Sequence, residues 1–149
     1  MIVTRNATAA DVDAWLALRA RLWPGTPLQE HRHELARQLA EPARFVALLA
    51  LDDDGRAVGF AEAALRTDPV AGCASSPVAF LEGIYVQPAR QRRGAARALC
   101  AAVERWAVAH GCRELASDAL VENGASHDFH CAVGFTPTER VVFYRKELK

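Results

Sequence analysis

The residues best suited to chemistry lie between Glu82 and Ala96, where an apolar strand runs into a basic loop and then a helix. Gly94 begins that helix directly after Arg92 and Arg93. Backbone N–H groups that converge at the N-terminus of a helix bind phosphate, and a glycine there lets the backbone approach the anion without a Cβ in the way. The spacing fits neither the three-glycine dinucleotide motif nor a P-loop. We therefore expect a phosphate site of another kind; the alternative is an ordinary arginine-rich loop before a helix.

Three carboxylates occupy positions that simple core packing does not explain. Glu82 lies inside an apolar strand that is otherwise suited to burial on both faces, and an unpaired buried carboxylate is costly. It should therefore reach a cavity or a cationic partner such as a nearby arginine, and Gly83 beside it indicates a bulge or splay in the sheet. Asp118 ends another strand, at the edge where open α/β sheets bind ligands, although it could simply cap the next turn. Glu139 precedes the last expected strand, and its simplest interpretation is a surface acid.

Together these acids indicate an acidic cleft in a protein of no net charge, because Lys plus Arg and Asp plus Glu both number 18. Such a cleft attracts a cationic substrate, whereas the balanced charge gives no reason to expect nucleic acid or a membrane as partner. The four cysteines lack a metal-binding spacing, so we expect reduced, mostly buried thiols and no metal site. The chain shows neither a signal peptide nor an apolar run of the ~20 residues that span a membrane, which favours a soluble, cytoplasmic protein.

The segment Gln91–Ala96, read Gln-Arg-Arg-Gly-Ala-Ala, resembles the Gln/Arg-x-x-Gly-x-Gly/Ala signature of GNAT-type N-acetyltransferases. In that superfamily the loop holds the pyrophosphate of acetyl-coenzyme A. More specific matches between residues 23 and 146 are similar to aminoglycoside 6′-N-acetyltransferases. They are Trp23-Pro24-Gly25, Ser75-Ser76-Pro77-Val78, Phe80-Leu81-Glu82-Gly83-Ile84, Gly111-Cys112-Arg113-Glu114, Ala116-Ser117-Asp118, Gly134-Phe135, Glu139-Arg140-Val141 and Phe143-Tyr144-Arg145-Lys146.

The resemblance implies a role for each matching residue. On the substrate side, Trp23 would line the antibiotic pocket, and the ammonium groups would be held by Glu82, Asp118 and Glu139. On the coenzyme side, the backbone of Ile84, Tyr85 and Val86 would pair with the pantetheine arm of acetyl-CoA, and Asn123 would touch the coenzyme. The pyrophosphate would be held by Gln91, Arg92, Arg93, Gly94, Ala95, Ala96 and Arg97. Thr26 stands where close relatives would have a histidine and Pro69 where they would have an aromatic residue, which leaves the range of antibiotics open.

The implied activity is transfer of the acetyl group of acetyl-CoA to the 6′-amine of an aminoglycoside, which confers antibiotic resistance. An alkyl ammonium must lose a proton before it attacks a thioester, so Glu82 is the first candidate for the base, directly or through a water, and Asp118 the second. Backbone N–H groups near Tyr85 and Val86 would stabilise the oxyanion. Many superfamily members have a tyrosine that protonates the leaving thiolate where this chain has His130, for which a packed or solvated helix histidine is the alternative. Another small polyamine, a peptide amine, and a non-catalytic acyl-CoA-binding module remain as alternative functions.

The elements that must position these residues follow from hydrophobic periodicity and turn residues. The order β-α-α-β-β-β-α-β-α-β predicts a single α/β (α+β) domain over residues 1–149, with a mixed central sheet and about four helices, and it matches the GNAT fold. A first helix follows an N-cap at Thr8, with Asp11 as a weaker capping box, and ends before Trp23. Further helices are expected over 28–40, 94–110 and 124–133, and strands over 2–5, 44–51, 57–65, 78–86, 114–118 and 141–144. His31 and His33 are expected on the exposed face of the second helix, and the last strand is the candidate interface of a homodimer, a common assembly in the resembled family.

Overall fold

Five strands form one sheet, in the order β1-β2-β3-β4-β5. A computed structural model describes the whole chain, residues 1–149, as two compact units, 1–118 and 119–149, and the sheet belongs to the first. The strands are β1 (Val3–Asn6), β2 (Phe45–Leu51), β3 (Ala57–Arg66), β4 (Val78–Val86) and β5 (Leu115–Ser117). Neighbours from β1 to β4 pair antiparallel, whereas β5 runs parallel to β4. The sheet is therefore mixed, as the sequence predicts.

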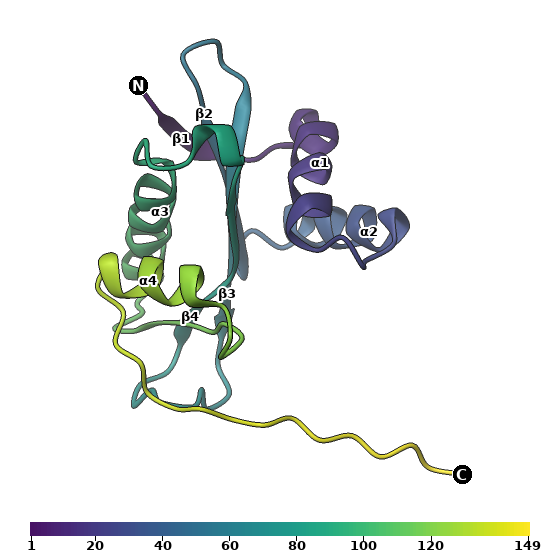
Figure 1. Ribbon diagram of the computed structural model, residues 1–149, viewed down its shortest axis with the longest axis vertical. Helices are drawn as coiled ribbons and strands as arrows, with labels where there is room; N and C mark the ends of the chain where they lie inside the picture. The colour runs from purple at the N-terminus through teal and green to yellow at the C-terminus, as the bar shows by residue number, and fades with distance from the viewer. The chain divides into compact units, whose positions relative to one another are not determined.

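Three α-helices of the first unit cover both faces of this sheet. Figure 1 shows α1 (Val12–Leu22) and α2 (Leu28–Ala40) on one face and α3 (Ala95–Ala109) on the other. Pro24 and Gly25 lie in the turn that separates α1 from α2, and Pro27, which lacks a backbone N–H, directly precedes α2. Short 3₁₀ turns over 9–11 and 88–90 lead into α1 and into the loop before α3. α1 packs on β3 and β4, whereas α2 packs on β2 and on α1.

The core on the α1 side of the sheet is built from large apolar side chains. Trp15 and Phe60 have no exposed surface, and Leu35 and Leu49 are 1% exposed. Burial of a side chain of this kind contributes roughly 1.5–3 kcal/mol. Because these residues come from α1, α2, β2 and β3, the core fixes both helices against the middle strands.

The second unit contains one helix, α4 (Gly124–Ala132). Asn123 caps it, because its side chain accepts a hydrogen bond from the backbone N–H of Ser126 at 3.1 Å. The strand predicted over 141–144 is absent, since residues 135–149 form neither helix nor strand, and Phe143 and Tyr144 are 91% exposed. The prediction is wrong for a single chain because a strand needs a partner for its backbone groups, and no strand of this chain pairs with the segment.

The strands β1 to β5 and the helices α3 and α4 lie within one residue of their predicted bounds, and α2 and β4 have the predicted bounds. The first helix is expected directly after Thr8, but the chain there forms the 3₁₀ turn 9–11 and becomes α-helical only at Val12. His31 differs, because it is 1% exposed rather than on the exposed face of α2, whereas His33 is exposed as expected. All four cysteines are free; Cys100 and Cys112 are buried, but Cys131 is exposed. None of the helices has both the length and the apolar composition needed to cross a bilayer.

Candidate functional site

β4 contains a bulge at Glu82. In its pairing with β3, Glu62 lies opposite Gly83 and Ala63 lies opposite Leu81, so Glu82 is the extra residue between them. A bulge bends its strand and redirects the side chain of the extra residue. The Glu82 side chain is accordingly 38% exposed although its strand is otherwise apolar. The bulge predicted beside Gly83 is confirmed.

Beyond this bulge, β4 has a neighbouring strand on one side only. β3 pairs with β4 as far as Val86, but β5 pairs only with Ala79–Leu81. The other edge of Ile84, Tyr85 and Val86 therefore presents backbone groups that no strand uses, and such an edge can pair with an extended ligand. One group is already engaged, since the Gln91 side chain donates through Nε2 to the Val86 backbone oxygen at 3.1 Å.

The loop between β4 and α3 has the conformation of an anion site. Arg92 (φ 61°) and Gly94 (φ 84°) both adopt the left-handed conformation, which occurs in loops whose successive N–H groups form an anion-binding concavity. α3 follows with 15 residues and no acidic residue in its first turn, so its N-terminus favours a negative ligand. Arg90 anchors the loop, because its guanidinium lies 3.3 Å from the carboxylate of Asp52 in the β2–β3 turn.

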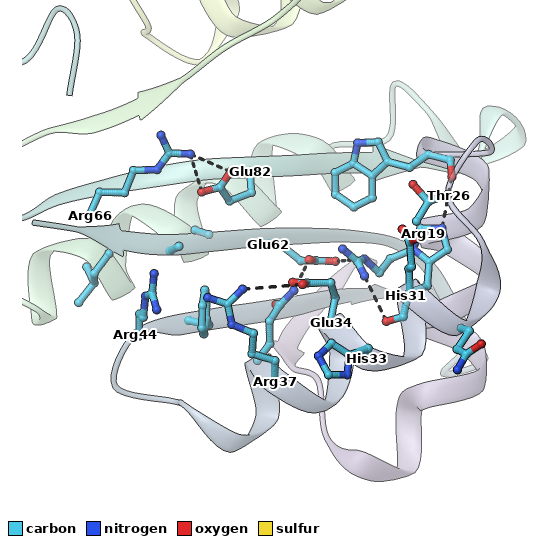
Figure 2. A pocket seen from close by; sticks show the side chains of 18 residues that line it. Arg19, Thr26, His31, His33, Glu34, Arg37, Arg44, Glu62, Arg66 and Glu82 are labelled. Carbon is cyan, nitrogen blue, oxygen red and sulfur yellow. Dashed lines mark hydrogen bonds and ion pairs between the residues drawn. The ribbon is translucent and has the colours of Figure 1, made fainter. Parts of the chain in front are cut away.

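A cleft of about 960 Å³ lies between α2 and the β3–β4 part of the sheet, and Trp23, Thr26 and Glu82 line it. It also contains as many arginines as glutamates, namely Arg19, Arg37, Arg44 and Arg66 against Glu30, Glu34, Glu62 and Glu82. Figure 2 labels all of these except Glu30. Three of the four glutamates are ion-paired with arginines. The cleft that Glu82 lines is thus charge-balanced. Pro69 lies in a smaller pocket of about 560 Å³, which shares Arg44 and Arg66 with the cleft.

Glu62 is the most buried acid of the cleft. Arg19 Nε lies 2.8 Å from its Oε2, Trp15 Nε1 donates to the same oxygen at 3.0 Å, and Gln38 Nε2 donates to Oε1. Burial raises the pKa of Glu62, and these three partners act against that shift. Because the partners come from α1 and α2, the carboxylate ties both helices to β3.

Trp23 is held by several neighbours at the end of α1. The Arg19 guanidinium carbon lies 4.9 Å from the ring centroid, and the Phe60 ring meets the indole edge-on with centroids 6.0 Å apart. His31 Nε2 is hydrogen-bonded to the Trp23 backbone oxygen at 3.2 Å, which explains why this histidine is buried. The indole lies against Gly83, where an added Cβ would come within 2.5 Å of two ring carbons. A glycine is therefore needed at this point of β4 to admit the ring.

Glu82 is paired with Arg66 at the rim of the cleft (Figure 2). Arg66 Nη2 donates to both carboxylate oxygens of Glu82, at 2.9 and 3.1 Å. The guanidinium carbon of Arg66 also lies 3.6 Å from the centroid of the Phe80 ring. The sequence leaves a cavity or an arginine partner open for Glu82, and the structure has both.

Asp118 lies next to Glu82 in the register of the sheet. Ser117 is the last residue of β5 and lies opposite Leu81, so Asp118 and Glu82 each come one residue later, where the two strands stop pairing. Asp118 is exposed and does not line the cleft. The remaining predicted residues, Asn123 and Glu139, belong to the second unit, as does His130, whose Nδ1 is bonded to the Ser126 backbone oxygen at 2.6 Å.

Sequence reasoning does not identify three residues of the cleft, Arg19, Glu62 and Arg66. Glu62 carries the same signal as Glu82, a carboxylate inside an apolar strand, and that signal was sufficient to find it. The two arginines carry no signal of their own, because an arginine on a helix or at a strand end is ordinary. No group of three or more His, Cys, Asp or Glu side chains in residues 1–149 is arranged to hold a metal ion. Burial raises the pKa of Cys100 to about 11, so this thiol stays protonated at neutral pH.

Comparison with known proteins identifies relatives over almost the whole chain. The model of the acetyltransferase (GNAT) family matches residues 12–135. An aminoglycoside N(6′)-acetyltransferase type 1 from Serratia marcescens is 53% identical over 138 residues, which are 93% of this chain and 94% of that protein. A protein of the same name from Stenotrophomonas maltophilia is 53% identical over 147 residues, 97% of this chain and 93% of that one.

Solved structures of similar proteins have the same fold. The structure of AAC(6′)-Iy in complex with the bisubstrate analogue CoA-S-monomethyl-acetylneamine matches with a TM-score of 0.94 at 44% identity, covering 99% of each chain. The aminoglycoside antibiotic 6′-N-acetyltransferase AAC(6′)-Ih from Acinetobacter baumannii matches with a TM-score of 0.93 at 40% identity, covering 100% of each chain. The fold class predicted from the sequence is confirmed.

Proposed function

Because the chain belongs to the acetyltransferase (GNAT) family, and within it to the aminoglycoside N(6′)-acetyltransferases, we propose that it transfers the acetyl group of acetyl-CoA to the 6′-amino group of aminoglycoside antibiotics and thereby inactivates them. One observation carries the proposal. The bulge at Glu82 lies between two surfaces of different chemistry, a charged cleft on one side and a free β4 edge that leads to an anion-binding loop on the other.

The coenzyme binds along β4 and the loop that follows it. Pantetheine is an extended chain with two amides, and the free backbone groups of Ile84, Tyr85 and Val86 are suited to pair with them. The pyrophosphate accepts hydrogen bonds from the backbone N–H groups of residues 91–97 at the N-terminus of α3, where Arg92 and Arg93 add positive charge. Asn123 of the second unit contacts the coenzyme.

The antibiotic binds in the cleft. An aminoglycoside presents sugar rings with apolar faces and several ammonium groups, and the cleft presents the Trp23 indole beside the Glu82 carboxylate. Asp118, the neighbour of Glu82 in register, holds a further ammonium group, and the resemblance in sequence gives Glu139 the same role. Thr26 lines the cleft, so the identity of this side chain acts directly on the choice of antibiotic.

The reaction begins when the 6′-ammonium loses a proton, because the protonated amine has no lone pair for attack. Glu82 accepts the proton, directly or through a water. The amine nitrogen then forms a bond to the thioester carbonyl carbon, and backbone N–H groups near Tyr85 and Val86 stabilise the resulting oxyanion. The C–S bond breaks as the nitrogen releases its second proton to water and the amide forms. Coenzyme A leaves as a thiolate that is protonated by His130 or by water.

The competing base is Asp118, and steady-state rates across pH separate the two carboxylates. Glu82→Gln should lower kcat by about a hundredfold at neutral pH, because the ammonium loses its proton acceptor, whereas Asp118→Asn should keep kcat and bind the antibiotic more weakly. Full activity of Glu82→Gln would exclude Glu82 as the base.

We also propose that residues 1–149 act as one domain and that two copies form a homodimer in the cytoplasm. The family match over 12–135 runs across both compact units, which supports one domain. The exposed apolar run Val141–Tyr144 supports the dimer, because pairing with a strand of a second copy would bury it and satisfy its backbone. Acetyl-CoA, a cytoplasmic metabolite, supports the location. Light scattering should give the mass of two chains, and the mass of one chain for Phe143→Asp; a monomeric wild type would exclude the dimer.

The function is tested by the release of coenzyme A from acetyl-CoA with kanamycin, tobramycin and amikacin, beside spermidine and a short peptide. Rapid turnover with the antibiotics alone is expected. Turnover only with spermidine or peptide would replace the acceptor but keep acetyl transfer. Binding of acetyl-CoA without turnover of any amine would instead support an acyl-CoA-binding module.

A further inference from the structure

Glu82 lines the cleft in which a cationic substrate would bind, yet its carboxylate already forms an ion pair with Arg66. We infer that Arg66 occupies the ammonium site of Glu82 in the free protein, and that the substrate binds by displacing it. Arg66 is then a specificity-determining residue, because any amine must exchange for it. The inference rests on the proposed function in one respect, namely that Glu82 binds a substrate ammonium.

Arg66 contacts Glu82 through one nitrogen, as an ammonium group would, and not through the two nitrogens of a guanidinium fork. A single nitrogen, Arg66 Nη2, donates to both oxygens of Glu82 at 2.9 and 3.1 Å. A bidentate arginine uses two nitrogens on two oxygens, and that arrangement is the stronger one. One substrate nitrogen can therefore replace one arginine nitrogen with the same two contacts.

The pair is also weak enough to exchange. The Arg66 and Glu82 side chains are 43% and 38% exposed, and exposed ion pairs contribute little to stability. The ion pair of Arg19 with Glu62 in the same cleft differs, because it is almost fully buried. A ligand that separated these two side chains would leave a buried charge without compensation. The Glu82 carboxylate, unlike that of Glu62, is thus poised for exchange with a substrate.

Arg66 has an alternative position when it leaves Glu82. Its guanidinium already lies over the Phe80 ring, a contact that does not require Glu82. Arg66 also borders the smaller pocket, which is lined by Asp68 and gives the displaced side chain room beside another carboxylate. The displaced charge is therefore not left in an apolar environment.

The displacement of Arg66 therefore selects against substrates with a single ammonium group. An amine that meets only Glu82 exchanges one ion pair for another and gains little free energy. A polyamine also meets further acids, so it gains enough to displace Arg66. Neutral sugars gain nothing at this position.

The test is the dissociation constant of tobramycin, measured by titration calorimetry on the full chain, for the wild type, Arg66→Gln and Arg44→Gln. Arg44 is the matched control, because it lines the same cleft and lies over an aromatic ring, Phe45, but its carboxylate neighbour is Glu41. Both substitutions remove one positive charge from the cleft. Arg66→Gln should lower the Kd about two- to fivefold more than Arg44→Gln does, the size of an exposed ion pair.

The same series in a Glu82→Gln background distinguishes displacement from general charge. There, Arg66→Gln should have no more effect than Arg44→Gln. The inference would be overturned if Arg66→Gln raised the Kd for tobramycin or changed it only as much as Arg44→Gln does. It would also be overturned if Arg66→Gln lowered the Kd by the same factor in the Glu82→Gln background as in the wild type. Arg66→Met, which keeps the contact with Phe80, replaces the first variant if that fails to fold. Absence of tobramycin turnover in the wild type would overturn the proposed function, whereas the Kd series decides the role of Arg66 separately.

Discussion

Arg19 and Glu62 form an ion pair of 2.8 Å whose side chains are only 8% and 3% exposed. The pair joins α1 to β3 in the wall of the cleft. Removing one partner leaves a buried charge without compensation, so Arg19→Met should lower the free energy of unfolding by about 3–5 kcal/mol. Urea denaturation measures the change.

The matched control for this variant is Arg56→Met. Arg56 is paired with Asp54 at 3.8 Å, but both side chains are exposed, so the loss should stay below about 1 kcal/mol. Equal losses of unfolding free energy in the two variants would show that burial of the Arg19–Glu62 pair does not increase its contribution to stability.

Gly83→Ala should damage the antibiotic site and leave the coenzyme site intact. The new Cβ would lie 2.5 Å from the Trp23 ring, which must move out of the cleft wall. A displacement of about 1 Å in a positioning group can change catalysis by about a hundredfold, so we expect kcat/KM for tobramycin to fall by ten- to about a hundredfold. The KM for acetyl-CoA should not change.

Gly25→Ala serves as the control, because a Cβ there meets no atom within 4 Å, although the turn that contains Gly25 also follows Trp23. Unchanged tobramycin kinetics in Gly83→Ala would mean that Trp23 does not form part of the substrate site.

Gly94→Ala should weaken the binding of acetyl-CoA. Gly94 has φ 84°, where a side chain costs about 1–2 kcal/mol, and relief of that strain would turn the loop N–H groups away from the pyrophosphate. Loss of one hydrogen bond to a charged group predicts an increase of about tenfold in the KM for acetyl-CoA.

Gly111→Ala imposes the same backbone strain at the other end of α3, where φ is 81° and no atom lies within 4 Å of the added Cβ. It should cost similar stability and leave the KM for acetyl-CoA unchanged. An equal rise in KM for both variants would point to general destabilisation rather than to the loop.

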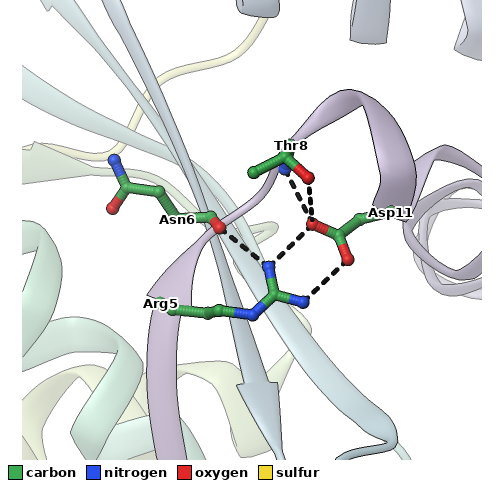
Figure 3. A network of polar contacts seen from close by, with 4 residues as sticks. All are labelled: Arg5, Asn6, Thr8 and Asp11. Carbon is green, nitrogen blue, oxygen red and sulfur yellow. Dashed lines mark hydrogen bonds and ion pairs between the residues drawn. The ribbon is translucent and has the colours of Figure 1, made fainter.

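Asp11 should make stability depend on pH in the acid range. Arg5 donates two hydrogen bonds to the Asp11 carboxylate, at 2.7 and 2.8 Å, and the Thr8 backbone N–H donates a third at 2.7 Å. Figure 3 shows these contacts. Arg5, foremost, and Thr8 hold the pKa of Asp11 well below its usual range. The unfolded chain takes up the proton near the ordinary value of about 3.9, so the stabilisation is present above that pH and is lost as the pH falls through the folded-state value.

Urea denaturation of the wild type and of Asp11→Asn checks this sign. The wild type should be more stable at neutral pH by about 1 kcal/mol, which is typical of a helix cap, and the difference should shrink as the pH falls below about 3.9. Arg5→Gln should reproduce most of the effect. A difference that does not vary with pH would contradict the assignment.

The sequence specifies this fold well where the signal is local. The bulge in β4 is predictable because an acid and a glycine together interrupt an apolar strand, and the capping box of the 3₁₀ turn that leads into α1 is predictable from Thr8 and Asp11. The loop before α3 is predictable because Gly94 follows two arginines.

Prediction fails where a residue's environment comes from distant segments. His31 is buried because its ring reaches the Trp23 backbone, a contact that helical periodicity does not contain. The cleft is charge-balanced because arginines from α1, α2 and β3 meet its acids, and their positions depend on tertiary packing. The segment 141–144 has the composition of a strand, but no strand of this chain pairs with it.

The most direct test of the central claim is the structure of the product formed from tobramycin and acetyl-CoA, determined by NMR. The account predicts one acetyl group, on the 6′-nitrogen, and no product from an analogue with a hydroxyl at that position. Acetylation of any other amine, or equal turnover of the 6′-hydroxyl analogue, would contradict it.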